Sequence, residues 1–164
     1  MMEKRVDTGS TGTARAETPG ALVDRLCRVT NNHDLEALVD CFAEDYVNEA
    51  PAHPARGFRG RDQVRRNWEQ ILGAIRDFNA SVRWVEDGST VWSEWDMHGT
   101  LPDGRPHRMA GVVVFGVEDG RFTWARFYLE PVDPDTSGVD EAIRSHLHQD
   151  AASEAAARQP AGGR

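Results

Sequence analysis

The stretch "YVNEAPAHPARGFRG", residues 46 to 60, holds the residues best suited to acid–base chemistry. Asn48 and Glu49 end a strand-like run, and His53 follows in a loop between two prolines. Histidine titrates near neutral pH, and a glutamate that turns into a buried site can act as a base. Prolines restrict the backbone on either side of the histidine. The stretch therefore predicts Glu49 and His53 as candidate catalytic groups.

Each of these residues also has a structural interpretation. Strict alternation along the strand gives Glu49 an outward direction, where it would be a surface charge or a partner of Arg56 or Arg59. His53 would then be a loop side chain hydrogen-bonded to the rim of a site. Asn48 points inward and would either orient a ligand or satisfy backbone groups inside the fold.

Signals for metal or cofactor chemistry are weak. Asp96, His98 and His107 could gather near one hairpin, but their spacing matches no recognised metal motif. The chain contains no CxxC, no GxSxG and no glycine-rich phosphate loop. Its only lysine, Lys4, lies in a loose leader, which argues against Schiff-base chemistry. We expect no metal and no cofactor.

Composition narrows the class of protein. The 164 residues are 39% hydrophobic, enough for one domain with a core, and the net charge of −8 argues against a nucleic-acid partner. No apolar run approaches the roughly 18 residues of a membrane span, and the N-terminus has no signal-peptide pattern. Cys27 and Cys41 are too few for a disulfide framework, which favours a reduced, cytoplasmic protein without a membrane partner.

Helix signals precede strand signals along the chain. Thr18 and Pro19 open a first helix, Asp34 caps a short second one, and residues 60–78 predict a third. Asp-Gly pairs then recur every 16 residues and predict hairpin turns. The strands that these turns separate are expected at about 78–86, 90–100, 107–117 and 121–131.

Helices grouped before an antiparallel meander predict the α+β class. The expected fold is a curved antiparallel sheet that three N-terminal helices close into a cone with an internal pocket. We expect a disordered leader at 1–18, the cone domain at 19–133, and a tail with a short helix at 134–164.

Two-residue loops at 103–104 and 119–120 set the expected register of the sheet. This register gives the sheet one nearly apolar face, which should line the pocket. Inward residues of the first strand should line the pocket as well. The predicted ligand-binding residues are Tyr46, Asn48, Ser93, Trp95, Met97, Val112 and Phe127.

The opposite face mixes aromatic and charged side chains, which a lone monomer rarely exposes together. We expect a homodimer through this face; the alternative is a solvated face on which arginine and aromatic side chains stack. The residues of the predicted interface are Trp92, Phe115, Trp124, Arg126 and Tyr128.

Four segments resemble the SnoaL-like group of the nuclear transport factor 2-like superfamily. They are "NNHDLEALVDCFAEDYV", "GFRGRDQVRRNW", "WDMHGTLPDGR" and "VFGVEDGRFTWARFYLEPV", and the resemblance covers about residues 20 to 133. It implies the cone fold and an apolar pocket. It leaves the chemistry open, because this fold hosts cyclases, isomerases, hydrolases, dehydratases and binding domains.

The resemblance also implies where catalytic carboxylates should stand. The general base of ketosteroid isomerase falls here on Ala50, and its oxyanion-stabilising aspartate falls on Val112. The pocket aspartate of limonene-1,2-epoxide hydrolase falls on Phe127. None of these residues can transfer a proton.

Two hypotheses therefore stay open. The first is a cofactor-free cyclase, isomerase or epoxide hydrolase that acts on an apolar metabolite through Glu49 and His53. The second is a non-catalytic dimeric protein that binds an apolar small molecule in a lipophilic pocket.

Overall fold

The structure is a computed structural model that describes residues 17–133 and 138–145. The chain divides into two units between Val132 and Asp133. The first unit contains three helices and one sheet, and residues 139–145 of the second are helical. Most of the predicted leader at 1–18 and of the predicted tail at 134–164 lies outside the described residues.

Helix capping in the sequence is reproduced in the structure. Helix α1 spans Pro19–Asn31, and the Thr18 hydroxyl accepts a hydrogen bond from the Ala21 amide at 3.2 Å. Helix α2 spans Leu35–Asp40 and is capped by the Asp34 carboxylate. Both caps satisfy amides that a helix leaves unpaired at its first turn.

Helix α3 spans Arg61–Ala74 and follows Gly60, whose φ of 89° suits glycine. The predicted segment was longer, to residue 78. The helix stops at Ala74, and the next residue, Ile75, has a non-helical backbone.

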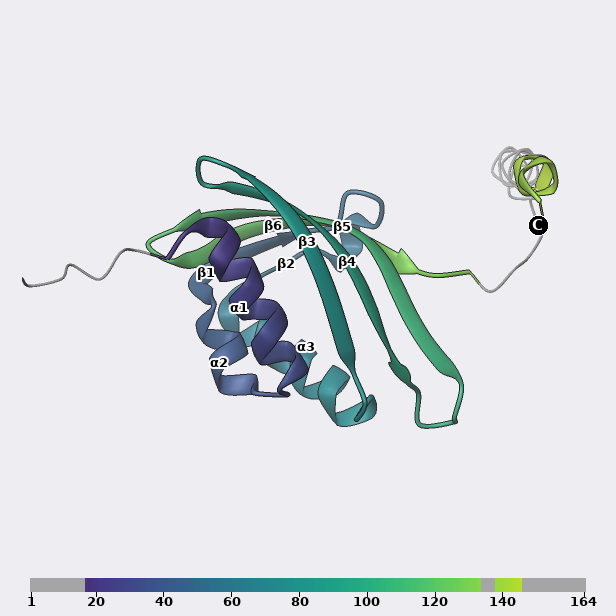
Figure 1. Cartoon of the computed structure of the whole chain (residues 1–164), viewed down its shortest axis with the longest axis horizontal. Helices are drawn as coiled ribbons and strands as arrows, with labels where there is room; N and C mark the ends of the chain where they lie inside the picture. Colours follow the sequence, from purple (N-terminus) through teal and green to yellow (C-terminus); the bar gives the residue numbers. More distant parts are fainter. Residues whose placement is uncertain (1–16, 134–137, 146–164) are drawn as a thin grey trace, which may run out of the picture. The chain divides into compact units, whose positions relative to one another are not determined.

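Six strands form one curved sheet in the order β2-β1-β6-β5-β4-β3 (Figure 1). The short 3₁₀ turn Pro54–Arg56 lies between β1 and β2. Strand β1 pairs in parallel with β6, whereas the other pairs are antiparallel. The strands are β1 Phe42–Glu49, β2 Phe58–Arg59, β3 Asn79–Asp87, β4 Thr90–Thr100, β5 Pro106–Glu118 and β6 Arg121–Pro131. The predicted four-stranded meander is confirmed, and the α+β class with it.

The register of β5 was predicted wrongly. Thr100 pairs with Pro106, so the loop between β4 and β5 has five residues, Leu101 to Arg105, instead of two. The Gly104 amide donates to the Leu101 carbonyl at 2.8 Å, and the Leu101 amide donates to the Arg105 carbonyl at 2.9 Å. The Asp-Gly pair is therefore the end of a longer closed turn, and this offset turns each β5 side chain to the opposite face.

A second offset restores the predicted faces of β6. The pairing of β5 with β6 shifts by one residue between Gly116 and Val117. Such a bulge places two residues of one strand opposite one of the other. Phe127 consequently pairs with Val113, and Phe127 keeps its expected inward direction.

Two predicted positions change as a result. Phe115 pairs with Val91, is 2% exposed and belongs to the core, so its predicted place in a dimer interface is wrong. Val112 pairs with Glu94 on the outer face, so its predicted place in the pocket wall is also wrong. Val113, opposite Ser93, points inward in its place.

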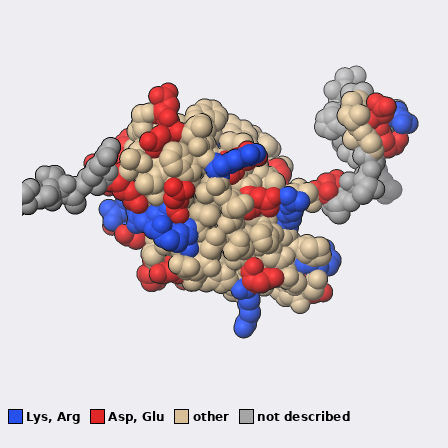
Figure 2. Space-filling model, viewed as in Figure 1, with Lys and Arg blue, Asp and Glu red and all other residues tan. Residues whose placement is uncertain are grey.

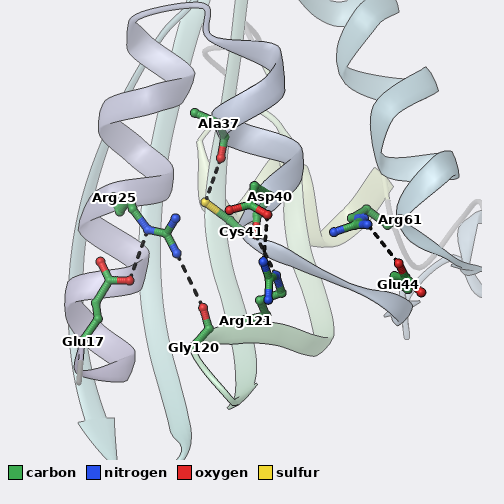
Figure 3. A network of polar contacts seen from close by, with 9 residues as sticks. All are labelled: Glu17, Arg25, Ala37, Asp40, Cys41, Glu44, Arg61, Gly120 and Arg121. Carbon is green, nitrogen blue, oxygen red and sulfur yellow. Dashed lines mark hydrogen bonds and ion pairs between the residues drawn. The ribbon is translucent and has the colours of Figure 1, made fainter.

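The inner face of the sheet packs against the helices, which cover one side of it (Figure 1). The Asn31 side chain joins α1 to β3 with two bonds to the Ala80 backbone, at 2.7 and 2.8 Å. At the other end of the sheet, Arg121 donates to the Asp40 carboxylate at 2.9 Å (Figure 3). This hydrogen bond lowers the pKa of Asp40. Polar contacts thus help to fix the helices to the sheet at both ends of its strands.

Ion pairs also organise the surface. Figure 2 shows acidic and basic side chains lying next to one another on the face in view. On the outer face of the sheet, Arg83 pairs with Glu94 at 2.7 Å, and Arg108 pairs with Asp96. Among the described helices, none is both long and apolar enough to cross a membrane.

Candidate functional site

A cavity of about 450 Å³ lies between α3, the inner face of the sheet and the loop after β1. Its wall is mostly apolar, with a small number of polar groups, as is usual for small-molecule sites. The lining residues are Phe42, Tyr46, Asn48, Ala50, His53, Arg56, Phe58, Val64, Asn67, Trp68, Ile71, Ile75, Phe78, Met97, His107, Met109, Phe127, Leu129 and Glu130.

The apolar wall follows from the periodicity of its elements. In β6, Phe127 and Leu129 alternate with outward-facing residues, as expected for a strand with one buried face. In α3, Val64, Trp68 and Ile71 recur at helical spacing and meet the cavity from the other side. An apolar ligand between these two walls would bury apolar surface of its own and of the protein. Such burial contributes a favourable free energy of about 25 cal/mol per Å² of apolar surface.

Tyr46 and Asn48 place a polar pair in this wall. They stand two residues apart on β1, and the Tyr46 hydroxyl donates to Asn48 Oδ1 at 3.2 Å. The tyrosine ring packs edge-on against Phe42, with 4.9 Å between ring centroids. Burial strongly raises the pKa of the Tyr46 phenol, so this hydroxyl stays protonated and serves as a hydrogen-bond donor.

His53 and Glu130 form an acid–base pair within the lining. His53 Nε2 lies 3.0 Å from Glu130 Oε1, and the Arg56 guanidinium lies 3.7 Å from the other carboxylate oxygen. The His53 and Glu130 side chains are 41% and 44% exposed, so both also reach solvent. An imidazole beside a carboxylate can take up a proton from a ligand and release it to water.

The loop after β1 holds His53 in place through its own backbone. The His53 amide donates to the Ala50 carbonyl at 2.9 Å, and the Arg56 amide donates to the His53 carbonyl at 2.9 Å. Pro54 begins the 3₁₀ turn directly after the histidine, where its fixed φ fits. The prediction that His53 sits on a restricted loop is consistent with this geometry.

Glu49 points outward, as strict alternation along β1 predicts. It is exposed and pairs with Arg126 on β6, with Oε2 and Nε 2.6 Å apart. It does not belong to the cavity lining. The structure therefore separates Glu49 from His53 and does not bring them together as one catalytic site.

The other predicted binding residues divide into two groups. Met97 and Phe127 line the cavity, as Tyr46 and Asn48 do. Ser93 and Trp95 point inward, but they are buried in the core and do not line it.

Sequence reasoning missed several lining residues, above all Glu130 and Asn67. Glu130 has the outward parity of β6, since it pairs with Ala110, so alternation along the strand does not assign it to the cavity. The parallel pairing of β1 with β6 sends the loop after Glu49 past the end of β6, beside Glu130. Asn67 follows Val64 at helical spacing, a signal that could have identified it.

The described residues contain no group of three or more histidine, cysteine, aspartate or glutamate side chains that could hold a metal ion. Of the three residues considered from the sequence, Asp96 pairs with Arg108 at 2.5 Å and His107 lines the cavity. The hydrogen bond from Arg108 lowers the pKa of the Asp96 carboxyl.

A curved sheet that helices close around an apolar cavity is the fold of nuclear transport factor 2-like proteins. Within that class, the chain belongs to the SnoaL-like domain family, which matches residues 23–125. A comparison with curated proteins found no match.

Solved structures give the same fold. IdmH from Streptomyces antibioticus, described provisionally as a polyketide cyclase, is 25% identical with a TM-score of 0.60, over 68% of this chain and 91% of that chain. A protein from Kribbella flavida DSM 17836, described provisionally as a ketosteroid isomerase, is 24% identical with a TM-score of 0.58, over 75% and 85% of the two chains. An LEH-like epoxide hydrolase from M. tuberculosis is 22% identical with a TM-score of 0.58, over 66% and 80%. The last two likenesses show the fold alone.

Proposed function

We propose that this protein binds a mostly apolar carbonyl compound in the cavity and that His53 moves a proton on it. The observation that carries the proposal is the His53–Glu130 contact of 3.0 Å within the lining of a mostly apolar cavity. The reaction class is proton abstraction next to a carbonyl, the step that isomerisation and cyclisation share. The similarity to IdmH, described provisionally as a polyketide cyclase, supports this class.

Glu130 would act through His53. Its carboxylate accepts a hydrogen bond from the imidazole, which fixes the orientation of the ring. Arg56 holds the second carboxylate oxygen at 3.7 Å and keeps the carboxylate at the histidine. A proton transfer of this kind needs an imidazole and a carboxylate, and it calls for no cofactor.

Hydrogen–deuterium exchange of 2-tetralone in D₂O tests the proposal without knowledge of the natural substrate. The protein should accelerate exchange at the carbon next to the carbonyl, and His53→Gln should lower that acceleration by about 10²-fold or more, the usual contribution of a general base. His98→Gln is the matched control, since His98 is an exposed histidine on β4 outside the lining. Wild-type exchange in a His53→Gln variant that still binds the ketone would refute the catalytic role.

Binding without catalysis is the second candidate function, and one observation favours it. The Tyr46 hydroxyl and the Asn48 side-chain oxygen, the buried polar pair of the wall, are bonded to each other. A wall whose polar groups are partly satisfied suits a lipophilic ligand. Binding of 2-tetralone without accelerated exchange would support this function.

We also propose that the outer face of the sheet packs against a second copy of the chain. Val85, Trp92 and Tyr128 are exposed there, at 68%, 54% and 45%. Charges on the same face are already paired within the chain, through Arg83 with Glu94 and Arg126 with Glu49. Two such faces can therefore approach without unpaired like charges, and the exposed aromatic side chains gain from burial.

A further inference from the structure

The orientation of the Asn67 side-chain amide, on α3, is fixed by hydrogen bonds with two neighbouring side chains. Its Oδ1 accepts from Gln63 Nε2 at 2.8 Å, one helical turn earlier. Gln63 Oε1 in turn accepts two bonds from the Arg66 guanidinium, from Nε at 3.2 Å and from Nη2 at 2.5 Å. The three side chains form a relay that begins at the surface and ends at the cavity wall.

Arg66, the first residue of this relay, determines which group donates and which accepts at each of its hydrogen bonds. A guanidinium carries donors and no acceptor, so the Gln63 oxygen must face Arg66 and the Gln63 NH₂ must face Asn67. An amide NH₂ only donates, so Asn67 must present its oxygen to Gln63. Asn67 Nδ2 then remains, and within 17–133 and 138–145 no hydrogen bond from it is found. Since Asn67 lines the cavity, this NH₂ is a donor available to a ligand.

We infer that Asn67 is a ligand-binding residue that selects a hydrogen-bond acceptor, and that Arg66 and Gln63 are the positioning residues that set this preference. The inference rests on the proposed function, because it concerns a ligand in the same cavity. The ligand class is an apolar ketone. A hydrocarbon would leave the NH₂ unpaired, and an alcohol that accepts the bond would bury its own O–H beside an apolar wall.

Asn67 also fits the proposed reaction. Removal of a proton next to a carbonyl places negative charge on the carbonyl oxygen, and an N–H that already points at this oxygen stabilises that charge. His53 and Asn67 belong to different elements of the same lining, the loop after β1 and helix α3. The proton and the oxygen are therefore handled by separate parts of the fold.

Three probes with one ring skeleton test the selection: 2-tetralone, 2-tetralol and tetralin, each titrated calorimetrically into the full chain. Wild-type protein should bind the ketone more tightly than the hydrocarbon. Asn67→Leu should reduce that preference by about threefold to tenfold, the range of one neutral hydrogen bond, with no loss of tetralin affinity. Gln70→Leu is the control on the same helix: Gln70 bonds to the Arg66 carbonyl, lies outside the lining, and should keep the wild-type preference.

Substitutions at Arg66 test the polarity itself, and the exposed position tolerates them. Arg66→Lys keeps a donor-only group and should preserve the preference for the ketone. Arg66→Glu accepts from Gln63 NH₂, which turns the Gln63 oxygen to Asn67 and the Asn67 oxygen to the cavity, so the preference should shift toward 2-tetralol.

The outcomes separate this inference from the proposed function. Probes that bind with the same ketone preference in wild type, Asn67→Leu and Arg66→Glu would overturn the role of Asn67 and leave the cavity as a binding site. A wild-type chain that binds none of the three probes would overturn the proposed function, and this inference with it.

Discussion

Ser93→Ala should destabilise the fold markedly and leave ligand binding unchanged. Ser93 is 1% exposed, and its hydroxyl donates to the Val113 carbonyl at 2.6 Å while it accepts from Trp95 Nε1 at 2.9 Å. The hydroxyl therefore serves two buried groups on two neighbouring strands. Alanine serves neither of them, although it fits the space.

The magnitude follows from the two bonds. An indole N–H left without a partner in the core costs about 1–3 kcal/mol, and the lost bond to the carbonyl costs about 0.5–1.5 kcal/mol. We therefore expect Ser93→Ala to lower the free energy of unfolding by about 2–4 kcal/mol, a large share of the stability of a typical domain. Urea unfolding should show this as a lower midpoint with an unchanged slope.

Two further variants make the measurement specific. Ser81→Ala, at an exposed serine on the neighbouring strand β3, should change stability by no more than about 0.5 kcal/mol. The variant Trp95→Phe has no indole N–H that could lose its partner. In that background, Ser93→Ala should lower the free energy of unfolding by about 1–3 kcal/mol less than it does in the wild type. Equal stability of Ser93→Ala and Ser81→Ala would refute this account, and a lower affinity of folded Ser93→Ala for 2-tetralone would return Ser93 to the ligand site.

Two more predictions concern the core and the outer face. Burial raises the pKa of the Cys41 thiol to about 11, so its thiolate fraction at pH 8 should be about a hundredfold below that of an ordinary thiol. Iodoacetamide followed by mass spectrometry should label Cys41 only after denaturation; rapid labelling of the native protein would contradict the burial. Light scattering should show a dimer for the wild type and for Arg76→Glu, a control outside the sheet, and a monomer for Trp92→Glu; a dimeric Trp92→Glu would remove the outer face as the interface.

Local signals in the sequence predicted the elements well. Thr18 and Asp34 are caps in the structure because a side-chain acceptor before a helix satisfies amides that the helix cannot. Asp119 and Gly120 form the predicted two-residue turn, and both have the positive φ that such a turn requires. These features depend on a few neighbouring residues, which a sequence displays directly.

The length of the loop between β4 and β5 was the local feature that the sequence did not predict correctly. The same Asp-Gly signal occurs at Asp103 and Gly104, and Gly104 also has a positive φ, but the turn begins at Leu101. The offset of one residue in this loop reverses the faces predicted for Val112 and Phe115. The second offset, at the Gly116 bulge, restores the predicted faces of β6. Two errors of register can cancel, so a correct assignment of faces for β6 does not validate the assignment for β5.

The acid–base pair at the cavity depends on a contact that no local pattern displays. His53 and Glu130 meet because β1 lies beside β6 in parallel, a pairing in which Glu49 and Arg126 are 77 residues apart in the chain. Alternation along β6 alone assigns Glu130 to the outer face. It reaches the cavity because it stands near the end of its strand, where the loop after β1 passes.

The corrected register of β5 still places no carboxylate of this strand on the face that meets the cavity. The apolar assignment of β5 rested on Val112, which turns out to face outward. Its replacement, Val113, is equally apolar, and the same face of that strand carries His107, Met109, Gly111 and Phe115. Whichever face of β5 meets the cavity, then, no carboxylate of that strand is available to act as a base. On the inner face of the sheet, His107 of β5 is a lining side chain that can carry a proton. Among the described lining residues, His53 with Glu130 is the acid–base pair in contact.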